Sequence, residues 1–225
     1  MGPRARAAAE RKDGLSMAKY LIVGDSQSQG TPGQYAQRKL ESAGHQVQRI
    51  AHQGKGAIDY TTTDSLWSEY TGALRSFAPD AVILIFGSND SGGRLPDALR
   101  RMKDAASGKT VWISGPPLYP EASRQRLGEG IRDANRLVFG DKWIDAYPST
   151  PLTIPRDSLR AHLPGEGGRP WGEAIATSVL TNRAPRPQGS MPLPLVIGLS
   201  AAGVALIVGV AWFASKPKAR ARLGA

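Results

Sequence analysis

The stretch Lys19-Tyr20-Leu21-Ile22-Val23-Gly24-Asp25-Ser26 runs from a mostly apolar, strand-like segment straight into a turn that carries a hydroxyl group. A second apolar run, Ala81 to Phe86, leads in the same way into Gly87-Ser88-Asn89-Asp90. A run that is apolar throughout is typical of a strand covered by helices on both faces. Ligands of parallel sheets bind outside the carboxyl ends of the strands, so the sequence predicts that Ser26 and Asn89 lie at one edge of one sheet.

Strand and helix patterns alternate on both sides of these turns, throughout residues 17–182. Strands are predicted at 19–23, 46–50, 81–86, 110–114 and 142–145, and helices at 33–43, 64–77, 95–105, 121–138 and 167–180. Five short strands separated by helices predict an α/β fold, a three-layer α/β/α sandwich with a five-stranded parallel sheet.

The net charge of this 225-residue chain is +10, which taken alone would suggest a nucleic-acid partner. The charge lies at the ends of the chain, however. Residues 1–16 carry four basic and two acidic side chains, and residues 183–225 carry six basic and no acidic ones, which leaves +2 for residues 17–182. We therefore expect no basic groove and no nucleic-acid partner. The chain has no cysteine, which excludes disulfides and thiolate metal ligands.

The C-terminal sequence predicts a membrane anchor, with a lipid bilayer as partner. Residues 195–215 carry no charged side chain, and about twenty helical residues span about 30 Å, the thickness of the hydrocarbon core. We expect a transmembrane helix at 195–215, preceded by a Pro-rich tether at 183–194 and followed by a basic tail at 216–225. Residues 1–16 lack the apolar stretch of a secretory signal and are expected to form a disordered leader.

Two features of this anchor disagree about which side of the membrane holds the domain at 17–182. Four positive charges just after the span favour a cytoplasmic tail and a domain outside the cytoplasm. A late span without a signal sequence is instead typical of tail-anchored proteins, whose domain stays in the cytosol. We favour the outward orientation of this single-pass protein, because the tail is short and its charge is dense.

The parts needed to hydrolyse an ester occur along the chain in the order Ser26, Asn89 and His162. Ser26 at a strand-to-helix turn would expose its hydroxyl as a nucleophile. His162 would accept the proton, because histidine titrates near neutral pH. The Asn89 side-chain amide would donate to the oxyanion. Each residue alone has an ordinary explanation as a turn or a helix cap, so the prediction depends on all three together.

These residues resemble the sequence blocks of the SGNH (GDSL-type) hydrolases, a family of flavodoxin-like fold, over about residues 19–180. Gly24-Asp25-Ser26-Gln27-Ser28 is similar to the block of the nucleophile, and Gly87-Ser88-Asn89-Asp90 matches the block of the oxyanion asparagine. Gly54-Lys55-Gly56 is similar to the block whose glycine amide donates to the oxyanion. The segment HLPGEGGRPW at 162–171 is similar to the block that begins with the general base.

The resemblance implies a serine esterase that works through an acyl-enzyme, with Ser26 as nucleophile and His162 as general base. The oxyanion hole would consist of the Ser26 N–H, the Gly56 N–H and the Asn89 amide. Gly56 fits the usual spacing of the family better than Gly54, which is assigned to substrate binding. The resemblance implies no cofactor and no metal.

The sequence departs from the family at the acidic member of the triad. The family carries an aspartate three residues before the histidine, and Leu159 occupies that position here. The nearest acid is Asp157, five residues before His162, and a two-residue bulge would let its carboxylate orient the imidazole. In the alternative, a backbone carbonyl holds the ring, and Ser26 and His162 form a dyad with slower turnover.

The substrate is the least determined part of the prediction. The family acts on carbohydrate O-acetyl groups, acyl thioesters, lysophospholipids and simple esters. The membrane anchor favours O-acyl groups, O-acetyl above all, of a cell-envelope polysaccharide, with a lipid or thioester as the alternative. Tyr119 follows the fourth predicted strand and is assigned to substrate binding, where it would stack on a sugar or merely pack. A structural membrane component of an envelope or virion assembly is a further alternative.

Overall fold

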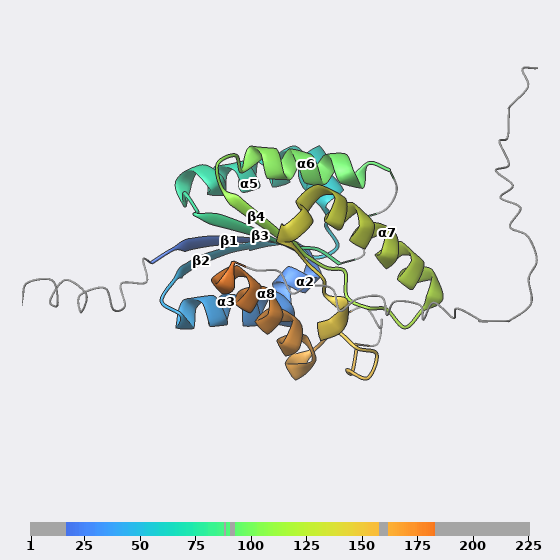
Figure 1. Ribbon diagram of the computed structural model, residues 1–225. Helices are drawn as coiled ribbons and strands as arrows, with labels where there is room; N and C mark the ends of the chain where they lie inside the picture. Colours follow the sequence, from blue (N-terminus) through green and yellow to red (C-terminus); the bar gives the residue numbers. More distant parts are fainter. Residues whose placement is uncertain (1–16, 88, 91–92, 158–161, 183–225) are drawn as a thin grey trace, which may run out of the picture. The chain divides into compact units, whose positions relative to one another are not determined.

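Five parallel strands form the centre of the structure, a computed structural model that describes residues 17–87, 89–90, 93–157 and 162–182. The strands are hydrogen-bonded in the order β2-β1-β3-β4-β5 and lie between two layers of helices (Figure 1). This is the strand order of flavodoxin-like doubly wound sheets. The predicted three-layer α/β/α architecture with a five-stranded parallel sheet is therefore confirmed.

The observed elements follow the predicted alternation closely. The strands are β1 (Lys19–Gly24), β2 (Gln46–Ala51), β3 (Ala81–Ile85), β4 (Thr110–Ser114) and β5 (Trp143–Ile144). The helices are α2 (Ser26–Gln29), α3 (Thr31–Ser42), α4 (Ala57–Thr62), α5 (Asp64–Ser76), α6 (Leu95–Ala105), α7 (Ala122–Phe139) and α8 (Arg169–Thr181), with 3-10 turns η1 (Gly140–Lys142), η2 (Tyr147–Ser149) and η3 (Gly165–Gly168). The short helices α2 and α4 were not predicted, and each lies next to the candidate site.

Alternating residues of the central strands pack against the two helical layers. Leu21 and Leu84 belong to the core cluster that includes residues of α4, α5, α6 and α7. Ile22 and Ile83 belong to a separate cluster with residues of α3 and α8. Figure 1 shows α3 and α8 on one face of the sheet and α5, α6 and α7 on the other. Both faces of the strands are thus covered, as their apolar sequences predict.

The pairing of β1 with β3 brings the two polar turns together. The two strands are parallel with Gly24 opposite Ile85, so the residues that follow leave the sheet side by side. At this point the backbones approach so closely that a Cβ on Gly24 would lie 1.9 Å from the Ile85 carbonyl oxygen. The Asp25 N–H donates to the same carbonyl at 3.3 Å. Glycine before Asp25 is therefore a requirement of this close approach.

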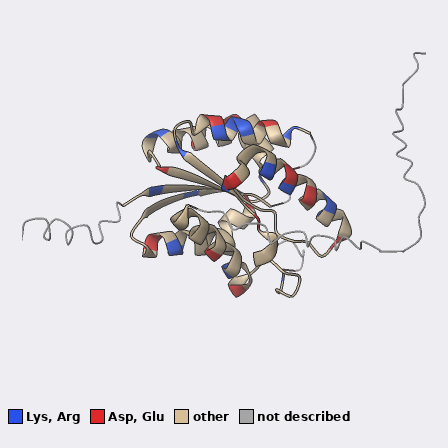
Figure 2. Ribbon diagram, in the orientation of Figure 1, with Lys and Arg blue, Asp and Glu red and all other residues tan. Residues whose placement is uncertain are grey.

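The predicted leader, tether, transmembrane helix and basic tail lie outside the described residues. Within the described ranges, none of the helices has the length and apolar character needed to cross a membrane. On the domain itself, Lys and Arg are interspersed with Asp and Glu along the helices (Figure 2).

Close packing of α8 on α3 at Gly172 generates a stability prediction. A Cβ at Gly172 would lie 2.5 Å from the Pro32 carbonyl oxygen, whereas a Cβ at Gly72, within α5, would meet no atom within 4 Å. We expect Gly172→Ala to lower the free energy of unfolding by about 1–3 kcal/mol, because α8 must move away from α3. Gly72→Ala is the matched control and should raise it by roughly 0.5–1 kcal/mol. Urea denaturation measures both, and a stabilising Gly172→Ala would contradict this packing.

Candidate active site

Ser26 is the first residue of α2, at the carboxyl end of β1. Asp25 is the N-cap of this helix, and its Oδ1 accepts a hydrogen bond from the Gln27 N–H at 2.8 Å. The Gly30 N–H donates to the Ser26 carbonyl at 2.8 Å and closes the single turn. N–H groups in the first turn of a helix have no intrahelical acceptor, so the Ser26 N–H is available to an anion.

The structure brings Ser26, His162 and Asp157 into one hydrogen-bonded chain. His162 Nε2 lies 2.9 Å from Ser26 Oγ, and His162 Nδ1 lies 2.5 Å from Asp157 Oδ2. The side chains of His162 and Asp157 are 31% and 27% exposed, so solvent reaches both. The partners assign the tautomer: Nδ1–H donates to the carboxylate, and Nε2 accepts from the serine hydroxyl.

The five-residue spacing between Asp157 and His162 is bridged by backbone hydrogen bonds. The Asp157 N–H donates to the His162 carbonyl, and the His162 N–H donates to Asp157 Oδ1, both at 3.2 Å. These contacts place the carboxylate beside the imidazole, as a two-residue bulge would. Further along, Leu163 and Trp171 are fully buried, and the Trp171 indole N–H donates to Ser114 Oγ on β4 at 2.8 Å. The segment of the histidine is thereby attached to the sheet.

Asn89 reaches the same edge of the sheet from the turn after β3. Its Nδ2 donates to Asp25 Oδ2 at 2.7 Å, and the Gly87 N–H donates to the same oxygen at 2.6 Å. Burial raises the pKa of Asp25 to about 6, although its hydrogen bonds with Gly87, Gln27 and Asn89 favour the charged form. Asn89 itself is exposed, and a primary amide has two hydrogens, so one remains for a substrate oxygen.

The geometry differs from the prediction at the glycine donor. Gly56 is buried, and its N–H donates to Asp59 Oδ2 at 2.9 Å. Gly54 is exposed with φ +72°, a conformation that favours glycine, and its N–H has no acceptor among the described residues. The Gly56 N–H therefore already has an acceptor, whereas the Gly54 N–H of the same turn remains available to a ligand.

Tyr119 is placed where it cannot stack on a sugar. Its side chain is buried, with 2% of the residue exposed. The hydroxyl lies close to Gly87 and the ring close to Gly128, since a Cβ on these glycines would meet it at 3.4 Å and 3.6 Å. Of the two roles that the sequence left open for Tyr119, stacking on a sugar and packing, its burial favours packing.

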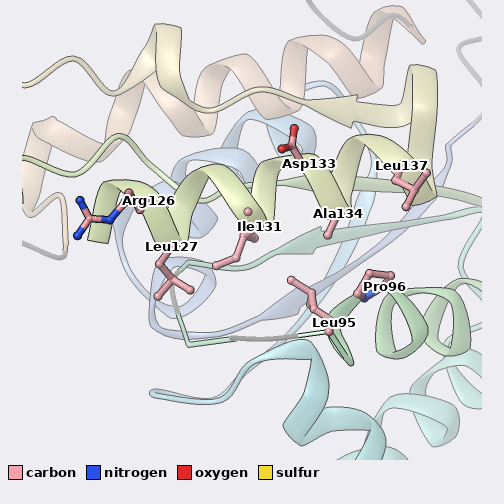
Figure 3. A pocket seen from close by; sticks show the side chains of 10 residues that line it. Leu95, Pro96, Arg126, Leu127, Ile131, Asp133, Ala134 and Leu137 are labelled. Atoms are coloured by element: carbon pink, nitrogen blue, oxygen red, sulfur yellow. The ribbon is translucent and has the colours of Figure 1, made fainter. Parts of the chain in front are cut away.

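Two cavities of the domain differ in whether they include a predicted site residue. One, of about 350 Å³, is lined by Pro120 and residues 152–157 and so includes Asp157. The other, of about 390 Å³, lies between α6 and α7, is mostly apolar and contains none of the predicted site residues (Figure 3). No cluster of three His, Asp or Glu residues that could bind a metal occurs in the described part of the chain.

No family model and no curated protein matches the sequence. Solved structures do match. The periplasmic domain of a lipopolysaccharide acetyltransferase from Salmonella ser. Paratyphi A aligns with TM-score 0.55 and 13% identity over 80% of this chain and 90% of that chain. A family two carbohydrate esterase from Cellvibrio japonicus aligns with TM-score 0.54 and 16% identity over 73% of this chain and 61% of that chain. A protein from Slackia heliotrinireducens described as an SGNH hydrolase aligns with TM-score 0.53 and 14% identity over 73% of this chain and 100% of that chain.

The described domain has the SGNH-hydrolase fold. At these identities the likeness concerns the fold, and the chemistry of this chain rests on its own site geometry. Two residues in which the sequence resembles the SGNH hydrolases, Ser26 and His162, are joined in the hydrogen-bonded chain that ends at Asp157.

Sequence reasoning assigned no role to two buried carboxylates beside this site. Asp25 has no exposed surface, and Asp90 is 2% exposed. A signal for both was present, because each lies in the polar turn that follows an apolar strand. An acid buried at such a position must bind backbone N–H groups, or its charge would be too costly.

The contact between Asp157 and His162 predicts a triad rather than a dyad. Asp157→Asn should lower kcat by at least a factor of about a thousand, because an amide at Nδ1 favours the wrong imidazole tautomer. Glu166→Gln is the control, since Glu166 is exposed in the following turn and binds the Tyr35 hydroxyl. It should stay within about twofold of the wild type. Steady-state kinetics decides, and a loss under about tenfold for Asp157→Asn would indicate a dyad.

Proposed function

We propose that this domain is a serine ester hydrolase that works through an acyl-enzyme. The supporting observation is the continuous chain of contacts from Ser26 Oγ through His162 to Asp157, at 2.9 Å and 2.5 Å. A serine hydroxyl is a weak nucleophile unless an adjacent base removes its proton. A third group must orient that base, and Asp157 occupies the corresponding position.

In the first half of the reaction, His162 Nε2 accepts the Ser26 proton while Oγ attacks the ester carbonyl carbon. The imidazolium that forms is stabilised by the Asp157 carboxylate at Nδ1. His162 then gives the proton to the leaving alcohol, and an acyl group remains on Ser26 Oγ. In the second half, His162 takes a proton from water, and the resulting attack releases the carboxylic acid and restores the serine.

Charge develops on the carbonyl oxygen in both halves, so fixed donors are needed there. We assign this role to the Ser26 N–H, the free hydrogen of the Asn89 amide and the Gly54 N–H. The Gly54 N–H replaces the Gly56 N–H of the sequence prediction, because Asp59 already accepts the latter. Loss of one such donor typically costs about 3–4 kcal/mol of barrier.

For the substrate, we propose O-acyl groups, and O-acetyl groups above all, of a cell-envelope polysaccharide. The structural likeness to a carbohydrate esterase and to a lipopolysaccharide acetyltransferase domain supports an acyl group on a sugar hydroxyl. The apolar sequence at 195–215 supports attachment to a membrane, and the four positive charges that follow it support a domain outside the cytoplasm.

The proposed nucleophile is tested by labelling and kinetics together. Ser26→Ala should abolish ester hydrolysis and labelling by a fluorophosphonate, because no other hydroxyl contacts His162 within the described residues. His162→Ala should reduce both nearly as much. Ser28→Ala is the matched control: it removes a buried hydroxyl of the same short helix that contacts no described polar group. If Ser26→Ala retains full esterase activity, the proposed function is wrong.

The proposed substrate is tested by comparing acyl groups. We expect acetate release from O-acetylated polysaccharides, and p-nitrophenyl esters should lose kcat/KM as the acyl chain lengthens beyond two carbons. The Ser26→Ala protein provides the background rate. A kcat/KM that rises with chain length would instead support the lipid or thioester alternative and contradict the acetyl assignment.

A further inference from the structure

The donors of the proposed oxyanion hole come from three separate segments of the chain. The Ser26 N–H belongs to α2, the glycine turn at 54–56 precedes α4, and Asn89 follows β3. Such donors stabilise an oxyanion only when they are held in fixed positions relative to one another. Some contact outside the catalytic chain must therefore connect the three segments.

Asp25 connects the nucleophile segment to the Asn89 segment. Its Oδ1 accepts from the Gln27 N–H of α2 at 2.8 Å. Its Oδ2 accepts from the Gly87 N–H at 2.6 Å and from Asn89 Nδ2 at 2.7 Å. The Asn89 contact uses one amide hydrogen and so determines the direction of the other. The carboxylate also lacks any exposed surface, so water does not compete for these bonds.

Asp90 connects the Asn89 segment to the glycine turn. Its two carboxylate oxygens accept from the Ala57 N–H and the Ile58 N–H, both at 2.9 Å, at the start of α4. The fit allows no side chain at the residue before α4, because a Cβ on Gly56 would lie 2.3 Å from Asp90 Oδ1. The start of α4, which directly follows the glycine turn at 54–56, is therefore bound to the residue after Asn89.

Burying these two carboxylates in their ionised form lowers the stability of the fold. Burial raises the pKa of both Asp25 and Asp90, and the charge of Asp90 adds to the effect at Asp25. Serine or asparagine would cap the starts of α2 and α4 without burying a charge. Serine, however, is too short to reach the other segment as well, and asparagine has one acceptor oxygen instead of two. The cost is therefore explained by the link between segments rather than by helix capping alone.

We propose that Asp25 and Asp90 are positioning residues of the oxyanion hole, which together connect the Ser26, Asn89 and Gly54 segments. This inference rests on the proposed esterase function. Neither residue touches the reacting atoms. Asp25 acts through the Asn89 amide, and Asp90 acts through the turn before α4.

The decisive experiment is a double-mutant cycle between Asp25→Asn and Asn89→Ala. Asn89→Ala should lower kcat by about a hundred- to a thousandfold with KM within about twofold. Asp25→Asn directs an amide at the N–H groups of Gly87 and Asn89, so it should lower kcat by about a hundredfold at similar KM. Because both changes remove the same donor, the double variant should fall no more than about threefold below Asn89→Ala. Multiplicative losses would contradict the proposal.

Two further variants separate positioning from folding. Asp25→Ser still caps α2 but is too short to reach Asn89, so it should fold and show the same non-additivity. Asp90→Asn keeps one acceptor for α4 and should lower kcat by about tenfold. Asp145→Asn is the matched control, since Asp145 is a buried acid that pairs with Arg132. It should lower stability with kcat within about twofold. A folded Asp25→Ser with wild-type kcat would overturn the proposal.

A measurement that does not depend on catalysis distinguishes this inference from the proposed function on which it rests. In ¹⁵N NMR spectra, the Asn89 side-chain amide, assigned by its absence in Asn89→Ala, should lose its hydrogen-bonded shift in Asp25→Ser. The Gly54 backbone amide should move in Asp90→Asn and not in Asp145→Asn. If these shifts occur but the wild type hydrolyses no ester, the proposed function is wrong and the connection between segments is correct. If the amides do not respond, the connection itself is wrong.

Discussion

The hydrogen bonds of the Asp25 carboxylate are the interaction on which the site depends. They exist because β1 and β3 are neighbours in register, so the turns after Gly24 and Ile85 leave the sheet together. Burial raises the pKa of Asp25 to about 6 in the folded state, above its ordinary value of 3.8. Ionised Asp25 therefore lowers stability at neutral pH, and this penalty disappears as the pH falls from about 6 toward 3.8. This penalty occurs at the carboxylate that binds both the start of α2 and Asn89, two of the segments proposed to form the oxyanion hole.

The long helices and strands of this fold could be predicted from the sequence, because their hydrophobic patterns extend over enough residues to be recognised. The apolar run of β3 and the amphipathic face of α5 both exceed four residues, and both were predicted. The helices α2 and α4 have four and six residues, too few for a helical period to show. They depend instead on side chains outside the helix that accept from its first N–H groups, as Asp25 does for α2. Asp90, for example, binds the start of α4 from more than thirty residues away.

The site, like the fold, could be predicted from the sequence in part. Ser26 and Asn89 stand in recognisable motifs that follow parallel strands, so their proximity follows from the sheet. His162 was identified by its motif alone, because it lies on the segment before α8 rather than after a strand. The choice between Gly54 and Gly56 depends on which N–H already has an acceptor, and the contact of Gly56 with Asp59 is not visible in the sequence. The two roles of Tyr119, stacking and packing, stayed open for a related reason. A sequence shows that a tyrosine follows a strand, but it does not show which side of the turn its ring faces.

The residues of the proposed catalytic site fall into two groups with different supports. The proposed nucleophile and oxyanion donors follow the carboxyl ends of β1, β2 and β3, where the buried carboxylates of Asp25 and Asp90 lie. Base and acid lie on the segment before α8, which is attached to β4 through Trp171 and Ser114. The hydrogen bond between Ser26 and His162 spans the two groups. A change that loosens α8 therefore alters the base without altering the oxyanion donors. This separation would let the proposed donors keep their positions at the sheet edge while the segment with Asp157 and His162 departs from the family spacing.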